Sequence, residues 1–293
     1  MAATDPHAGL ALEHAVQRIA SLDRSAEHRR VAFAPNATMA WRRFGAGPPL
    51  VLIHGGHGSW LHWVQNIDAL SRDHALWVPD LPGYGDSDAV GPGDRLDGHV
   101  NAVMGSLDQL LGERAVIDLA GFSFGGLVAA AIAARRGAIR RLALIGTAGH
   151  GGERRLAQSL RKWRSLDDAA RSAAFRHNLA ALMLHDPAAI DALALAAYEA
   201  SCRATRFHSR ALSLDASIAS LLADFAAPVL FAWGEHDVTT TPSTVAAELT
   251  RDRPQRRAVI VEGAGHWLQY ERATALDALL SDWFAEDSRE LCA

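Results

Sequence analysis

The pentapeptide Gly121-Phe122-Ser123-Phe124-Gly125 constrains this chain more than any other segment. It follows an apolar run, 115–120, and precedes an alanine-rich stretch, 127–136, which predict a strand and a helix. A serine between two glycines at a strand-to-helix junction is typical of a nucleophile elbow, a sharp turn that lifts the hydroxyl above a sheet. Glycine suits both flanking positions because a side chain there would clash as the turn tightens. Ser123 is therefore the candidate nucleophile.

A serine hydroxyl needs an adjacent base, which is itself oriented by a third group. His266 follows the strand-like run 258–261, and Asp237 ends the segment 228–237, an apolar strand that breaks into a polar loop. Glu235, two residues earlier, competes with Asp237 for the role of the acid. The chain order of serine, aspartate and histidine differs from that of the chymotrypsin and subtilisin triads. We therefore expect Ser123 to attack, His266 to act as the general base and Asp237 to orient it.

Four motifs in this order resemble the α/β-hydrolase superfamily, over about residues 31–284. They are the His54-Gly55-Gly56 loop, the segment 80–87 (Asp-Leu-Pro-Gly-Tyr-Gly-Asp-Ser), the elbow, and the pair Asp237 and His266. The resemblance implies an α/β-hydrolase fold, with a mostly parallel central sheet flanked by helices and a helical cap inserted after the sixth strand. It also favours Asp237 over Glu235, because the family's Gly-x-x-Asp pattern matches 234–237.

The resemblance extends to an oxyanion hole. In relatives with a His-Gly-x loop, one backbone N–H donor is the residue after the glycine, here Gly56, and the residue after the nucleophile, Phe124, supplies the other. The helix that begins after Ser123 directs the positive end of its dipole to the same place. His57, Phe122 and Trp267 are further candidates for substrate contact.

The chemistry of such a site needs no metal and no organic cofactor. His54, His57 and His62 invite a zinc hypothesis, because zinc sites use three or four ligands in a fixed geometry. We expect no metal here, since His54 belongs to the oxyanion loop.

Strand and helix patterns alternate along most of the chain, which is typical of a parallel sheet with covering helices. We expect the core to comprise residues 1–150 and 226–293, with a short N-terminal helix at about 9–20. No strand pattern occurs in 151–225, whose alanine- and leucine-rich text predicts a helical cap. Within this cap Arg203, Arg206, His208 and Arg210 form a basic cluster, which is either a solvated helix face or a carboxylate-binding group.

Composition and net charge limit the classes of partner that we expect for this chain. A hydrophobic fraction of 49% and a charged fraction of 21% fit a folded chain rather than a disordered one. The net charge of −4 favours neither nucleic acid nor an anionic membrane as a partner, and no apolar run is long enough to span a bilayer. We expect a cytoplasmic protein with a small-molecule substrate, and apolar surface on the cap or the N-terminal helix is a candidate homodimer interface.

These features predict a serine hydrolase that cleaves a small hydrophobic or aromatic carboxylic ester through an acyl-enzyme. An alternative is a hydrolase of carbon–carbon bonds in dienone acids from meta-cleavage. Trp267 directly after His266 resembles that group, whereas Phe122 and Phe124 depart from the polar elbow residues that its members commonly carry. A third hypothesis is a ligand-binding α/β-hydrolase homologue without catalysis, against which the complete triad argues.

Overall fold

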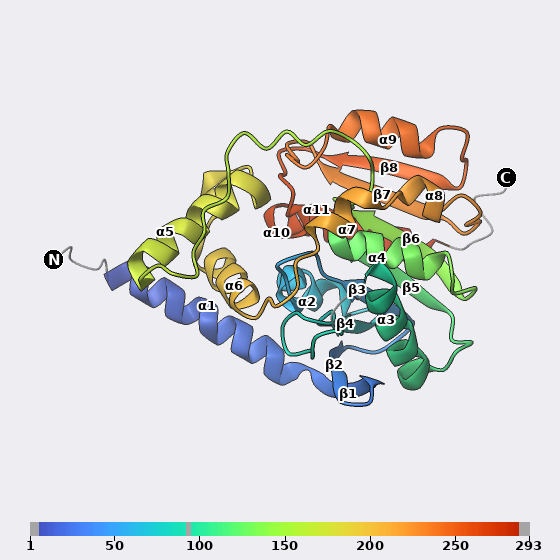
Figure 1. Cartoon of the computed structure of the whole chain (residues 1–293), viewed down its shortest axis with the longest axis horizontal. Helices are drawn as coiled ribbons and strands as arrows, with labels where there is room; N and C mark the ends of the chain where they lie inside the picture. Colours follow the sequence, from blue (N-terminus) through green and yellow to red (C-terminus); the bar gives the residue numbers. More distant parts are fainter. Residues whose placement is uncertain (1–5, 92–94, 287–293) are drawn as a thin grey trace.

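The computed structural model describes residues 6–91 and 95–286 of the 293-residue chain, and within them eight strands form one sheet (Figure 1). The strand order is β1-β2-β4-β3-β5-β6-β7-β8. The strands are β1 Glu27–Ala34, β2 Ala37–Phe44, β3 Pro49–Ile53, β4 Ala75–Pro79, β5 Ile117–Phe122, β6 Ile139–Ile145, β7 Val229–Gly234 and β8 Arg256–Val261. β2 is antiparallel to both β1 and β4, and every pairing from β4 to β8 is parallel. The expected mostly parallel sheet is confirmed.

Alternate residues of the central strands feed two separate hydrophobic cores. In β3, Leu50 and Leu52 face one core, whereas Val51 and Ile53 face the other. One face is covered by α3 (Leu96–Leu111), α4 (Phe124–Ala133) and α9 (Pro242–Thr250), and the opposite face by α2 (Ile67–Leu70) and α11 (Ala273–Ala285) (Figure 1). Because both faces are covered, the central strands are mostly apolar, and the charged residues of β5 and β6 (Asp118, Arg140 and Arg141) lie near the strand starts.

Residues 60–71 form two short helical pieces rather than one continuous helix. A 3₁₀ helix covers Trp60–Trp63, and α2 begins only at Ile67. Ser59 caps the first piece by accepting a hydrogen bond from the N–H of Leu61, and the Trp60 N–H donates to the carboxylate of Asp80 at 2.8 Å. These hydrogen bonds favour the tighter 3₁₀ turn at the start of the segment. Trp60, Trp63, Ile67 and Leu70 are nevertheless all buried.

The chain between β6 and β7 forms the cap. Its helices are α5 Asp168–Asn178, which continues as a π-helical turn over Leu179–Met183, a 3₁₀ turn Pro187–Ala189, α6 Ala192–Arg203, α7 Arg210–Asp215 and α8 Ile218–Leu221. The cap follows the sixth strand, as expected.

The expectation of helices throughout 151–225 was wrong for its first part, because residues 151–167 contain no helix. This segment runs from the β7–β8 side of the sheet across to α5 (Figure 1). Its backbone groups find partners elsewhere: the Arg155 N–H donates to the Val238 carbonyl and the Arg161 N–H to the Asn178 side chain. Such bonds replace those that a local helix would make.

The N-terminal helix α1 covers Pro6–Ser25, which is longer than the expected 9–20, and it lies along α6 of the cap (Figure 1). Ala15 and Leu22 are buried in a narrow stripe, while Leu10, Leu12 and Val16 are exposed. Within the described residues, no helix combines the length and the apolar character that a membrane span requires.

Candidate active site

Ser123 lies directly after β5, at the start of α4, in a strained backbone conformation with φ 53° and ψ −117°. Non-glycine residues rarely adopt a positive φ, and such strain concentrates at functional turns. A Cβ on Gly121 would lie 2.8 Å from the Ala129 methyl group, and one on Gly125 would lie 2.6 Å from the Ile53 carbonyl oxygen. Both glycines are therefore required by close packing of the elbow against its neighbours.

The structure brings together the three residues that the sequence singled out. The Ser123 Oγ lies 3.0 Å from Nε2 of His266, and the His266 Nδ1 lies 2.8 Å from Oδ2 of Asp237. The three follow β5, β8 and β7, and the carboxyl ends of these parallel strands meet at one edge of the sheet. With Nδ1 donating to Asp237, Nε2 is left to accept the serine proton.

Asp237 is fully buried, and its carboxylate has more than one hydrogen-bond donor. Besides the bond from His266, Oδ1 accepts from the Thr239 N–H at 2.8 Å and from the Thr239 hydroxyl at 2.7 Å. Burial alone would raise the pKa of this carboxyl, but the charge of His266 and the hydrogen bonds from His266 and Thr239 outweigh burial and hold the pKa below its usual value. Asp237 is thus an ionised partner for the imidazole. Glu235 instead accepts from the Gly263 N–H at the surface.

The glycine loop after β3 lies against the elbow. A Cβ on Gly55 would be 3.0 Å from the Ser123 Cβ, and one on Gly56 would be 3.8 Å from the Phe124 Cβ. Phe124 is the first residue of α4, so its N–H has no acceptor within the helix. In the described part of the chain no protein oxygen accepts from the Gly56 N–H either. Both proposed oxyanion donors therefore lie beside Ser123 with free N–H groups.

His54 holds this loop in place from below. Its ring accepts from the Leu81 N–H through Nε2 at 2.8 Å and donates through Nδ1 to the Gly55 carbonyl at 2.7 Å. Burial lowers the pKa of His54 below its usual value, which fits a neutral ring with one donor and one acceptor. His54 is thus engaged in the structure of the loop. Among residues 6–91 and 95–286, no three histidine, cysteine or carboxylate side chains gather as a metal site requires.

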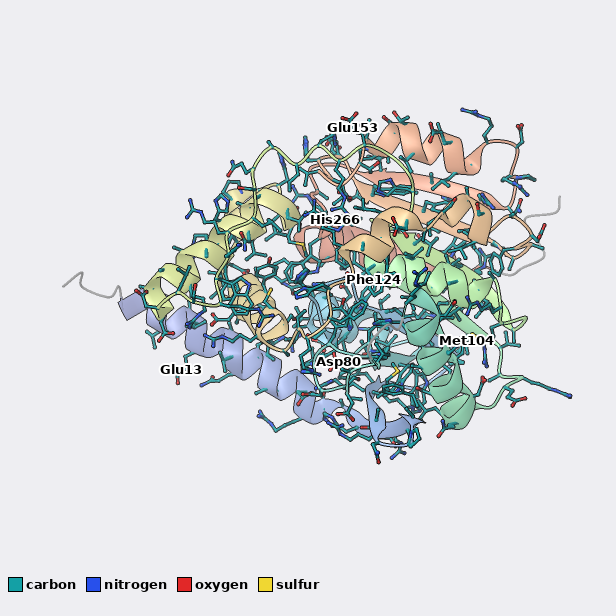
Figure 2. All side chains as sticks on the ribbon, in the orientation of Figure 1. Glu13, Asp80, Met104, Phe124, Glu153 and His266 are labelled. Atoms are coloured by element: carbon teal, nitrogen blue, oxygen red, sulfur yellow. The ribbon has the colours of Figure 1, made fainter. Side chains whose placement is uncertain are left out.

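Two cavities reach the site from different sides. The smaller, of about 110 Å³, is bordered by Ser123, His266, Thr239 and glycine backbone from 146–152, together with Arg154. The larger, of about 390 Å³, begins at Gly56 and His57 and extends under the cap. Its lining combines apolar and sulfur-containing side chains with three exposed cations, Arg161, Lys162 and Arg164. The apolar part consists of Leu160, Trp163, Leu182, Met183, Tyr198 and Cys202. In Figure 2 His266 and Phe124 lie near the middle of the molecule, between the cap helices and the sheet.

Of the three residues expected to contact substrate, only His57 lines a cavity. It has a left-handed backbone, with φ 55°, and burial followed by the neighbouring His208 lowers its pKa. Phe122 and Trp267 line neither of these two cavities, and their contact with substrate stays a prediction. Successive residues of β5 face opposite sides of the sheet, so Phe122 lies beneath the site, with its ring 4.9 Å from the His266 ring. Trp267 is fully buried and donates its indole N–H to the His62 carbonyl.

The segment 206–214 covers the nucleophile, and its arginines do not act as one cluster. Arg206 binds the carbonyls of Gly85 and Ser87, and Arg203 pairs with Glu199. A Cβ on Gly56 would overlap the Ser209 hydroxyl, so this cap residue lies directly over the oxyanion loop. The basic cluster read from the sequence is therefore divided. Arg203 and Arg206 bind away from the site, whereas the His208 ring lies 5.8 Å from the His57 ring and Arg210 lies near Arg154.

Two residues that support the site, Thr239 and Glu271, were not among those predicted from the sequence. Thr239 holds Asp237, and a hydroxyl two residues after the acid was a signal that could have been read. Glu271 accepts from the N–H groups of Gly265, His185 and Asp186, at 2.6, 3.1 and 2.5 Å. Glu271 thereby connects the cap to the loop that carries His266. Asp186 and Glu271 are 85 residues apart in the sequence, so no local pattern predicts their contact.

Comparison with known proteins identifies one family for most of the chain. The protein-family model described as "alpha/beta hydrolase fold" matches residues 48–273. The chain is 40% identical over 112 residues to 2-hydroxymuconate semialdehyde hydrolase of Pseudomonas sp. (strain CF600), which covers 36% of this chain and 38% of that protein. It is 40% identical over 95 residues to pimeloyl-[acyl-carrier protein] methyl ester esterase of Vibrio atlanticus (strain LGP32), covering 31% and 33%. The chain thus spans little more than a third of the length of these curated relatives.

Solved structures show the same fold. An esterase from Rhodococcus sp. ECU1013 superposes with a TM-score of 0.74 at 24% identity, over 89% of this chain and 99% of that one. A meta-cleavage product hydrolase from Pseudomonas fluorescens IP01 superposes with a TM-score of 0.71 at 23% identity, over 87% and 97%.

Proposed function

Because the chain belongs to the α/β-hydrolase fold family, we propose that it is a serine hydrolase that cleaves a carboxylic ester with a hydrophobic or aromatic group. The observation that carries the proposal is the hydrogen-bonded series from Ser123 through His266 to Asp237, with distances of 3.0 and 2.8 Å. The apolar cavity of about 390 Å³ that begins at Gly56 supports the substrate class. Relatives named as esterases, in sequence and in structure, point the same way.

The proposed reaction proceeds in two halves. The Ser123 Oγ attacks the ester carbonyl while His266 Nε2 takes its proton, and the ionised Asp237 stabilises the imidazolium. The negative oxygen of the tetrahedral intermediate accepts from the N–H groups of Gly56 and Phe124. His266 then returns the proton to the departing alcohol, which leaves an acyl group on Ser123. Water, deprotonated by His266, releases the acid and restores the serine.

A second candidate is the hydrolysis of a carbon–carbon bond in a dienone acid. It is favoured by the alignment with 2-hydroxy-6-oxononadienedioate/2-hydroxy-6-oxononatrienedioate hydrolase of Cupriavidus pinatubonensis, which is 28% identical over 82% of this chain and 88% of that protein. The same triad would serve, so the two reactions are separated by substrate rather than by catalytic residues. If the triad shows no catalytic activity, the chain is instead a ligand-binding protein.

The test is to treat the purified protein with a serine-directed fluorophosphonate and map the adduct by mass spectrometry. We expect one adduct, on Ser123, that is lost in the His266→Ala variant because the hydroxyl then has no base. Turnover of p-nitrophenyl esters of increasing chain length, beside a meta-cleavage dienone acid, then assigns the reaction. Ser123→Ala should lower kcat/KM by at least about 10⁴-fold, with an unchanged melting temperature. Absence of labelling in folded protein would contradict the proposal.

A further inference from the structure

The smaller cavity beside the triad carries an arginine that the proposed reaction does not use. Arg154 lines the cavity together with Ser123 and His266, and it comes from the helix-free segment that leaves the sheet after β6. The other groups on its wall are small or polar, among them Ser213, Thr239 and His150. A volume of about 110 Å³ admits a group of only a few non-hydrogen atoms.

The neighbouring residue fixes the position of Arg154. The Arg155 N–H donates to the Val238 carbonyl at 2.8 Å, and its side chain binds the carbonyls of Thr240 at 2.7 Å and Asp237 at 2.8 Å. Arg155 therefore anchors the segment to the loop that carries the catalytic acid. Because Arg155 is anchored in this way, the adjacent Arg154 is held at the cavity that it lines.

The smaller cavity carries a positive charge, that of Arg154, without a neighbouring carboxylate that pairs with it among the described residues. No carboxylate in the described residues forms a salt bridge with Arg154, and the nearby Asp237 is buried and held by His266 and Thr239. Burial and the neighbouring charge of Arg210 lower the pKa of Arg154, with Asp237 opposing them, and a guanidinium remains charged at neutral pH. Burial also lowers the pKa of His150, so the fixed charge that faces the cavity is positive.

We propose that Arg154 binds a carboxylate on the substrate, so that the preferred ester is apolar on one side of the scissile bond and carries a short anionic group on the other. The apolar arm packs against Trp163, Leu182 and Met183 in the larger cavity, whose three cations are exposed to solvent, and the short arm enters the smaller cavity. A guanidinium presents two parallel N–H donors to a carboxylate, which gives such a group a defined orientation. This inference rests on the proposed esterase function and specifies its substrate class.

Two pairs of esters test the inference, each pair differing only in charge. The first pair is the octanoyl esters of glycolate and of glycolamide, with the charge on the alcohol side. The second is monooctyl succinate and octyl succinamate, with the charge on the acyl side. For wild type we expect kcat/KM to favour the anionic member of one pair by about tenfold, mostly through KM, as for a charge-assisted hydrogen bond at a partly exposed site.

Variants of Arg154 test whether this residue causes the preference for the anionic ester. Arg154→Gln should reduce the anionic-to-neutral ratio to about one, and Arg154→Lys should retain part of it. Arg72→Gln is the matched control: Arg72 is an exposed arginine just before β4, at the sheet edge opposite to the triad, and its loss should leave the ratio unchanged.

The inference is overturned if wild type prefers neither anionic ester, or if the preference survives in Arg154→Gln. Failure of the parent proposal would look different: none of the four esters would be hydrolysed and Ser123 would take no fluorophosphonate, and the inference would then fall with it.

Discussion

The elbow beneath the substrate site and the cap above it are built in different ways. Around Ser123 the backbone segments touch, and a single methyl group on Gly125 would meet the carbonyl oxygens of Ile53 and His54. The cap meets the core through apolar side chains, since Phe175, Leu179 and Met183 belong to the same hydrophobic core as Trp267. Buried polar contacts add to this packing, such as the Trp267 N–H donating to the Met183 carbonyl at 2.7 Å and the three N–H groups that donate to Glu271. The elbow is thus fixed by contacts of backbone against backbone, whereas the cap is held by side-chain packing together with hydrogen bonds, chiefly those to Glu271.

The largest effect should follow from adding one methyl group to the tightly packed side of this comparison. Gly125→Ala places a Cβ against backbone oxygens that cannot withdraw without breaking the elbow. We expect a loss of about 3–5 kcal/mol in the free energy of unfolding, measured by urea denaturation. The matched control is Gly105→Ala in α3, where no atom lies within 4 Å of the new Cβ. It should raise stability by about 0.5–1 kcal/mol, because alanine favours a helix. Similar losses in both variants would contradict the packing argument.

Removing the polar contact between cap and core should have an intermediate effect. Glu271→Ala leaves the N–H groups of Gly265, His185 and Asp186 without their acceptor, and we expect a loss of about 2–3 kcal/mol. Hydrogen exchange should quicken at these three amides first. Glu235→Ala is the control, since this exposed carboxylate accepts from the Gly263 N–H and lies 3.5 Å from the exposed His236 ring, and its loss should cost below about 1 kcal/mol. Equal exchange in wild type and Glu271→Ala would show that the cap is held by its apolar contacts instead.

The smallest effect comes from a polar group that the core tolerates poorly. Burial raises the pKa of Asp277 to about 6, although its bond from the Asn66 amide opposes the shift. The folded chain then binds a proton more tightly than the unfolded chain, so stability should fall as pH rises from about 4 to about 6 and stay lower above that. The full shift corresponds to about 3 kcal/mol, which partial exposure of the side chain reduces to about 1 kcal/mol.

Asp277→Asn keeps the shape of this side chain and removes its charge. The variant should be more stable than wild type by about 1 kcal/mol at pH 7.5 and equal to it near pH 4, by urea denaturation at both values. A constant difference at the two pH values would point to packing rather than to ionisation.

Local sequence patterns were sufficient to predict the role of a residue that directly follows a strand of the sheet. Ser123, Asp237 and His266 each follow a strand, and parallel strands deliver their carboxyl ends to one edge, so chain order and spacing placed all three. The central strands were readable because strands covered on both faces are mostly apolar, whereas β1, which is largely exposed, begins earlier than its apolar residues indicate. The roles of Phe122 and Trp267 were not readable, since an aromatic residue beside a catalytic one can face either side of the sheet.

By itself the sequence determined the family, the sheet and the order of nucleophile, acid and base, because turn chemistry and hydrophobic periodicity are local properties of the chain. Only the tertiary structure decided what surrounds them: that Thr239 holds Asp237, that Glu271 joins the His266 loop to the cap, and that Arg154 lies in the cavity of Ser123. These contacts join residues through the packing of the cap against the core. Their free energy depends on distances that no sequence spacing encodes.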